Sequence, residues 1–220
     1  MKISLDPKRL HHAYGIEGDF LSVFPELASF FENALGESLS GNPDAYVRDT
    51  ASLSVEDARE VRGFAGMKSV RGGKKIIALS FVEGTRQAQN ALLKAIEEPV
   101  PETYFFIITP VLETLLPTLR SRLLLVTGTS SGERNELART FLETPVQKRI
   151  ALLKPFLEEK NRTGALSFAA ALLSEVRGET GKPLPAEKAE SLQTLVRAVR
   201  DLRLQGASVK AVLEHLALVL

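Results

Sequence analysis

Residues 75–109 read KIIALSFVEGTRQAQNALLKAIEEPVPETYFFIIT. Two apolar runs, Lys75–Phe81 and Thr103–Thr109, frame the segment Gln87–Glu97, whose apolar residues recur at helical spacing and which Pro99 ends. A continuous apolar run of about four to eight residues is typical of a strand that is covered on both faces, as in a parallel sheet. The stretch therefore predicts a strand–helix–strand unit with parallel strands.

The same alternation continues on both sides of this unit. Because strands that alternate with helices indicate an α/β fold, we expect a mostly parallel, five-stranded sheet flanked by helices. The N-cap of one helix is expected at Ser54, whose hydroxyl can accept a backbone N–H. The further strands are predicted at His12–Ile16, Ala45–Arg48 and Arg122–Thr127, and the further helices at Phe20–Leu35 and Val55–Phe64.

The character of the sequence changes after Thr127. The residues 128–132, Gly-Thr-Ser-Ser-Gly, are typical of a linker or turn, and helical periodicity dominates beyond them. We therefore expect two domains, an α/β domain over 1–130 and an all-helical domain over 131–220. The predicted helices are Glu133–Leu142, Pro145–Glu159, Ala165–Val176, Ala186–Leu204 and Ser208–Leu220, with a loop over 181–185.

Composition excludes several classes of protein. The 220 residues contain no cysteine, which excludes disulfides, thiolate metal sites and cysteine nucleophiles and fits a cytoplasmic location. No run of about 18 apolar residues is present, so we expect no membrane-spanning segment. With 28 basic and 27 acidic side chains, the net charge of +1 is too small for a protein that binds duplex DNA by itself.

The titratable residues do not form a recognisable catalytic or metal-binding motif. His11 and His12 precede the first strand and His215 lies in the last helix, so we interpret all three as surface or edge residues. We expect neither a metal nor another cofactor.

The first strand is followed by a degenerate phosphate loop. A phosphate-binding loop needs several glycines, a lysine and a Ser or Thr, but here Gly18 leads directly into a helix and Asp19 places a carboxylate where an anion would bind. The strand Lys75–Phe81 ends without the acidic pair that would hold magnesium, and the next acid is Glu83. These residues predict loss of nucleotide hydrolysis. One alternative remains, an α/β nucleotide hydrolase or transferase with an unusual site near Gly18 and Glu83.

Several segments resemble those of one family. Residues Gln87–Pro99 resemble the helix-and-turn signature of the clamp-loader AAA+ subunits of bacterial DNA polymerase III, the delta-prime and gamma/tau subunits. Thr103–Thr109 resembles their sensor-1 strand, and Leu115–Arg122 resembles the segment that ends in the Ser-Arg-Cys motif. Weaker similarities are found at His12–Tyr14, Ser54–Glu60, Gly72–Ile77 and Arg197–Leu220, the last to the close of the collar domain. The resemblance implies a P-loop-NTPase, AAA+-like fold.

The chain also departs from this family. It lacks the phosphate loop, the Walker B acids and the zinc-binding cysteines, and Leu123 stands in place of the Cys of Ser-Arg-Cys. Val111 stands near the usual sensor-1 Asn, and residues 131–220 are too few for a full lid and collar. The resemblance therefore implies a shortened relative without ATPase activity, most similar to delta-prime and not itself an enzyme.

The resemblance also assigns roles to particular residues. It implies that Arg122, with Ser121, acts as an arginine finger on a neighbouring subunit's nucleotide; the alternative is a locally paired surface arginine. Gln87, Gln89 and Asn90 are candidates for facing DNA, although their helix also packs on the sheet. The apolar stripe of the C-terminal helices is expected either to pack internally or to form an oligomerisation surface.

The function that these features imply is a non-catalytic, delta-prime-like clamp-loader subunit of DNA polymerase III. Its expected partners are gamma/tau and delta, with the sliding clamp and primed DNA reached through the assembly. A free-standing DNA-binding regulatory module derived from such a subunit is the second alternative, beside the hydrolase.

Overall fold

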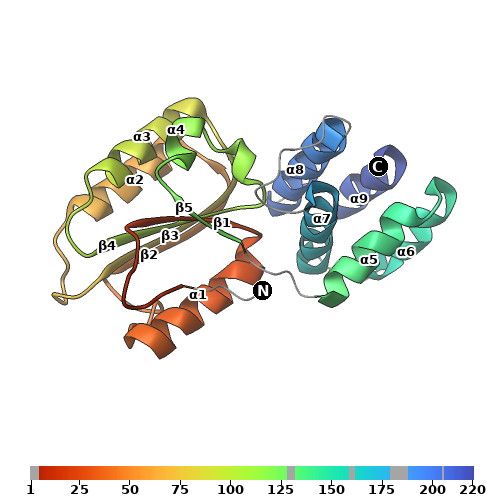
Figure 1. Ribbon diagram of the computed structural model, residues 1–220. Helices are drawn as coiled ribbons and strands as arrows, with labels where there is room; N and C mark the ends of the chain where they lie inside the picture. Colours follow the sequence, from red (N-terminus) through yellow and green to blue (C-terminus); the bar gives the residue numbers. More distant parts are fainter. Residues whose placement is uncertain (1–4, 128–131, 159–161, 179–187, 205) are drawn as a thin grey trace. The chain divides into compact units, whose positions relative to one another are not determined.

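A five-stranded parallel sheet forms the centre of the first of two units, Met1–Thr129 and Ser130–Leu220, in the computed structural model (Figure 1). The structure describes residues 5–127, 132–158, 162–178, 188–204 and 206–220. The strand order is β2-β3-β4-β1-β5, and every pair of neighbours is parallel, which confirms the predicted fold class. The strands are β1 (Ala13–Glu17), β2 (Ala45–Leu53), β3 (Lys75–Gly84), β4 (Thr103–Thr109) and β5 (Leu124–Thr127).

Helices cover both faces of this sheet, which explains why the central strands are apolar at consecutive positions. Along β3, Ile77 and Leu79 pack with α2 (Val55–Gly66) and α3 (Arg86–Glu97), whereas Ile76 and Ala78 pack with α1 (Phe20–Leu35) on the other face. Figure 1 shows α1 on one side of the sheet and α2 and α3 on the other. The chain between β4 and β5 forms a 3-10 turn, η1 (Leu112–Thr114), and the short helix α4 (Pro117–Arg120).

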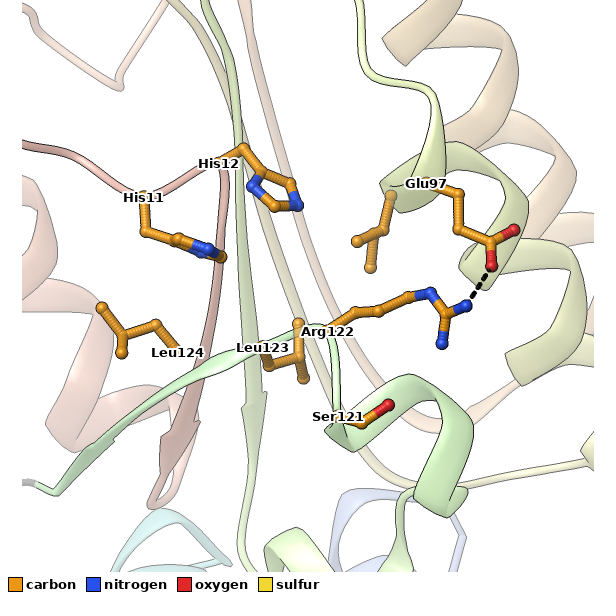
Figure 2. A pocket seen from close by; sticks show the side chains of 8 residues that line it. His11, His12, Glu97, Ser121, Arg122, Leu123 and Leu124 are labelled. Carbon is orange, nitrogen blue, oxygen red and sulfur yellow. Dashed lines mark ion pairs between the residues drawn. The ribbon is translucent and has the colours of Figure 1, made fainter.

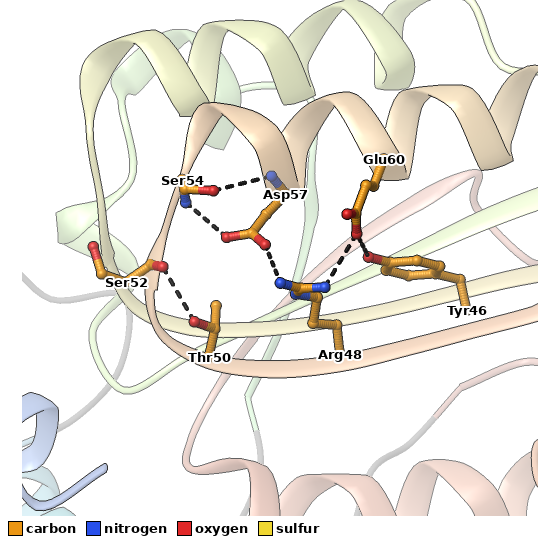
Figure 3. A network of polar contacts seen from close by, with 7 residues as sticks. All are labelled: Tyr46, Arg48, Thr50, Ser52, Ser54, Asp57 and Glu60. Atoms are coloured by element: carbon orange, nitrogen blue, oxygen red, sulfur yellow. Dashed lines mark hydrogen bonds and ion pairs between the residues drawn. The ribbon is translucent and has the colours of Figure 1, made fainter. Parts of the chain in front are cut away.

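The edge strand β2 is joined to α2 by a polar network (Figure 3). Arg48 forms ion pairs with Asp57 and Glu60, and the Tyr46 hydroxyl donates to Glu60 over 3.1 Å. Asp57 also accepts the backbone N–H of Ser54 over 2.9 Å, while the Ser54 hydroxyl accepts the N–H of Asp57 over 3.0 Å. This reciprocal capping box confirms the predicted N-cap and fixes the start of α2.

Two buried charged residues anchor the loop between α2 and β3. Asp44 accepts the backbone N–H groups of Val70 and Arg71 over 2.7 and 2.8 Å. The ammonium of Lys75 donates to the carbonyl of Met67 over 2.7 Å, near the end of α2. Because a buried charge is costly unless it is hydrogen-bonded, these contacts define the conformation of the loop.

The second unit is all-helical in the residues that the structure describes. Within it, α7 packs against α5 and α8, and α9 packs against α6 and α8. The guanidinium of buried Arg149 donates to four backbone carbonyls, three at the end of α5 and one in α9. The helices are α5 (Gly132–Glu143), α6 (Val146–Glu158), α7 (Arg162–Arg177), α8 (Ala189–Arg203) and α9 (Val209–Val219).

The largest differences from the predicted strand boundaries are found in β2, β3 and β5. The strands β2 and β3 run on to Leu53 and Gly84, so Glu83 lies within β3 and not beyond it. Arg122 does not begin a strand, because turn hydrogen bonds continue after α4 as far as Leu123 and β5 starts one residue later. The predicted linker at 128–132, except for its last residue, and the predicted loop at 181–185 lie outside the described residues. Among the described helices, none combines the length and apolar character needed to cross a membrane.

Candidate functional site

Arg122 lies in the turn between α4 and β5. Pro117 starts α4, and the buried side chains of Leu119 and Leu123 anchor the segment to the core on either side of the turn. The backbone N–H of Arg122 donates to the carbonyl of Leu119 over 3.1 Å, which continues the turn after α4. The Arg122 side chain keeps 40% of its surface exposed, so an external group could reach it.

Both terminal nitrogens of the Arg122 guanidinium are engaged within the chain. Nη2 forms an ion pair with Oε1 of Glu97 over 2.6 Å, and Nη1 donates to the carbonyl of Thr118 over 2.8 Å. Figure 2 shows the Glu97 carboxylate, at the end of α3, facing the guanidinium. Thr118 belongs to α4, so the arginine also caps one of the carbonyls that the end of this short helix leaves unpaired.

A cleft of about 440 Å³ surrounds this ion pair. The parallel topology explains its composition, because α3 ends at the edge of the sheet where β1, β4 and β5 begin. Residues far apart in sequence therefore meet there. The lining residues are His11, His12, Ile96, Glu97, Ser121, Arg122, Leu123 and Leu124.

The two histidines of the cleft are half-buried and lie just before β1, in keeping with the prediction that they are surface or edge residues. Their rings lie 4.3 Å apart, and Nδ1 of His11 lies 2.8 Å from the carbonyl of Ala13 at the start of β1. Burial, with the neighbouring charge of His11, lowers the pKa of His12 and favours its neutral form. His215, by contrast, is exposed on α9 as expected.

Gly18 and Asp19 lie at the opposite edge of the sheet, where β1 ends. The backbone N–H of Gly18 donates to the carbonyl of Thr109 over 2.9 Å. The Asp19 carboxylate accepts both the backbone N–H and the hydroxyl of Ser22, over 3.1 and 2.6 Å. The N-terminus of α1 is thus capped by its own side chain. The structure does not bring this position together with Arg122.

Glu83 lies near the end of β3 at the same sheet edge as Gly18. The strand β4 stands between β3 and β1, so these two positions are separated by a whole strand. In the part of the chain that the structure describes, no three His, Cys, Asp or Glu side chains are grouped closely enough to hold a metal ion.

The three polar residues of α3 differ in exposure. Gln87 and Asn90 are exposed, whereas Gln89 is buried with 2% of its surface exposed. The amide nitrogen of Gln89 donates to the carbonyls of Gly84 and Thr114 over 3.0 and 3.2 Å. Its amide oxygen accepts the backbone N–H of Leu116 over 2.7 Å. The expectation that Gln89 faces DNA is therefore wrong, because its amide joins α3 to the chain before α4.

Sequence reasoning missed Glu97, the cleft in which His11 and His12 meet Arg122, and the internal role of Gln89. Two signals were available. Gln89 lies three, four and seven residues before Leu92, Leu93 and Ile96, so helical spacing places it on the apolar face of α3. Glu97 is an acid in the last turn of a helix, where a carboxylate is disfavoured by the helix dipole and is therefore expected to have a cationic partner.

Comparison with known proteins identifies relatives over part of the chain. The model of the family described as "DNA polymerase III, delta subunit" matches residues 40–129. The DNA polymerase III subunit delta' of Escherichia coli (strain K12) is 40% identical over 86 residues, which are 37% of this chain and 26% of the relative. The delta' subunit of Yersinia pestis is 40% identical over 90 residues, covering 38% and 26% of the two chains.

These matches are partial, since the chain spans about a quarter of the length of the curated relatives it matches. A gamma subunit-related protein of DNA polymerase III from Thermotoga maritima aligns in structure over 93% of this chain and 92% of its own, with a TM-score of 0.43 and 16% identity. The family match over residues 40–129, which includes α2, α3 and the segment that carries Arg122, agrees with the resemblance derived from the motifs. Over part of its length, which includes residues 40–129, the chain is therefore similar to the delta and delta' subunits of DNA polymerase III.

Proposed function

We propose that this chain acts as a non-catalytic, delta-prime-like subunit of a DNA polymerase III clamp loader. In this role it supplies a rigid surface beside ATP-hydrolysing subunits while the sliding clamp is loaded onto primed DNA. The proposed direct partners are gamma/tau and delta, and the clamp and DNA are reached through the assembly.

One observation carries the non-catalytic part of the proposal, the arrangement at the start of α1. Only Gly18 and Asp19 separate β1 from this helix, and the Asp19 carboxylate occupies the helix N-terminus. A triphosphate would need several backbone N–H groups, a lysine and a hydroxyl there, and it would be repelled by the aspartate. We therefore propose that the chain neither binds nor hydrolyses ATP.

Arg122 is the residue that we propose acts on a neighbouring subunit. The guanidinium is partly exposed and lies on the segment whose sequence resembles the arginine-finger motif. An arginine delivered from an adjacent subunit stabilises the negative charge that develops on the transferred phosphoryl group. Ser121 follows α4 directly, and its hydroxyl donates over 3.1 Å to the Thr118 carbonyl, which also accepts from Arg122.

The test of this proposal is reconstitution. The chain is mixed with the gamma/tau and delta subunits of the same bacterium, and the DNA-stimulated rate of ATP hydrolysis is measured with wild type, Arg122→Ala and Arg120→Ala. We expect all three to assemble, and Arg122→Ala to lower the rate at least about tenfold. Arg120 is the matched control, because it is a neighbouring arginine of similar exposure that pairs with Glu113.

Calorimetry of the isolated chain tests the non-catalytic part. Titration with Mg-ATP should show no micromolar binding. Nucleotide turnover by the chain alone, abolished by Glu83→Gln, would instead support the hydrolase alternative. Tight binding of primer–template DNA by the chain alone, with a steep dependence on salt concentration, would support the free-standing regulatory module.

A further inference from the structure

The Glu97–Arg122 pair occupies the atoms through which Arg122 would bind phosphate. Arginine recognises phosphate with a fork of two N–H groups. Here Nη2 is held by Glu97 and Nη1 by the Thr118 carbonyl, so the fork is engaged inside its own chain. We call this arrangement the withdrawn position of Arg122.

We infer that Glu97 is a positioning residue for Arg122. Glu97 holds Arg122 in the withdrawn position until a phosphate group of a neighbouring subunit's nucleotide replaces the Glu97 carboxylate. This inference rests on the proposed function, because it concerns how the same arginine is made available.

The location of Glu97 supports this role. Glu97 is the last residue of α3, where the negative end of the helix dipole disfavours a carboxylate. The carboxylate is therefore poorly suited to stabilising its own helix and is stabilised instead by the cation that it faces. The adjacent Glu98 is also exposed, but no contact between it and Arg122 is present in the structure.

The strength of the pair suits an exchangeable contact. Both side chains are about 40% exposed, and ion pairs of this kind change an equilibrium only by a small factor. A phosphate with two negative charges, bound through Nη2 and through the second N–H of Nη1, can replace such a contact. The carbonyl of Thr118 stays in place throughout, because it belongs to the backbone of α4.

The cleft around the pair supports the same exchange. Its lining residues include one guanidinium and one carboxylate, with the half-buried imidazoles beside them. When Glu97 pairs with Arg122, the two charges cancel. When the carboxylate turns away, the cleft presents a cation to an incoming anion.

A first experiment measures the isolated chain. In ¹⁵N NMR spectra, rotation of the Arg122 guanidinium should be restricted in wild type and in Glu98→Gln but faster in Glu97→Gln. Glu97→Gln removes the charge with little change of shape at an exposed position, so we expect the variant to fold. Equal rotation rates in the three proteins would overturn the inference.

A second experiment uses the reconstituted assembly. Because the affinity of a ligand rises with the fraction of protein in the competent state, Glu97→Gln should lower the KM for ATP about twofold to fivefold and leave kcat unchanged. Glu98→Gln should match wild type. An unchanged or raised KM in Glu97→Gln would overturn the inference, whereas an inactive Arg122→Ala variant would still support the proposed function. If Arg122→Ala has no effect on hydrolysis, the proposed function fails first.

Discussion

Replacing Gln89 with alanine should destabilise the first unit, because its buried amide joins three backbone positions. The substitution removes two hydrogen bonds to carbonyls and one from the Leu116 N–H. A buried donor without a partner costs about 1–3 kcal/mol, and the two lost bonds to carbonyls add roughly 0.5–1 kcal/mol each. We expect the free energy of unfolding to fall by roughly 2–5 kcal/mol, which is roughly 30- to 5,000-fold in the equilibrium constant.

Hydrogen exchange can measure this loss at the residue concerned. The amide of Leu116 should exchange faster in Gln89→Ala, and urea unfolding followed by circular dichroism should show a lower midpoint. Asn90→Ala is the control, because Asn90 is the exposed neighbour on the same helix and should change stability by less than about 0.5 kcal/mol. If Gln89→Ala were as stable as Asn90→Ala, and the Leu116 amide were equally protected from exchange, the Gln89 side chain would not connect α3 to the chain before α4.

Three further predictions concern other anchors of the fold. Burial alone would raise the pKa of Asp44, but hydrogen bonds from the loop over 69–71 lower this pKa. The contribution of Asp44 to stability is therefore present above about pH 4 and is lost as the pH falls further. Asp44→Asn should remove this pH dependence of stability from unfolding curves measured between about pH 2 and 6. Arg149→Met should destabilise the helical unit by about 2–3 kcal/mol in thermal unfolding, because four backbone carbonyls lose their donor. The control Lys148→Met, at an exposed position, should change the stability of this unit little. Ser54→Ala should cost about 1 kcal/mol through loss of the cap on α2, and a cost below about 0.3 kcal/mol would contradict the capping box.

The fold was predictable where burial is uniform. The strand β4 and the helix α1 have the predicted bounds, because an apolar run covered on both faces and an amphipathic helix both carry strong patterns. The edge strand β2 was predicted to end at Arg48, since Asp49, Thr50 and Ser52 make its second half read as a loop. Pairing with β3 continues there nonetheless. The helix α4 has four residues, too few for any periodic signal.

The site was less predictable than the fold. Arg122 could be selected from its motif, but the partner that engages it is 25 positions away on another element, and neither residue alone indicates the pair. For Gln89, helical spacing to Leu92 and Ile96 places the residue on the apolar face of α3, but only the packing of this helix decides which backbone groups its amide bonds.

The amino-acid sequence by itself determined the alternation of strands and helices, the change to helical periodicity in the second half and the absence of a phosphate-loop motif after the first strand. Each of these follows from local periodicity or from residue types at adjacent positions. Only the tertiary structure decided that α3 ends beside the start of β5, so that Glu97 meets Arg122 within one cleft. Such a contact depends on how parallel strands and their crossover helices bring distant residues to a common edge, and local patterns do not encode that geometry.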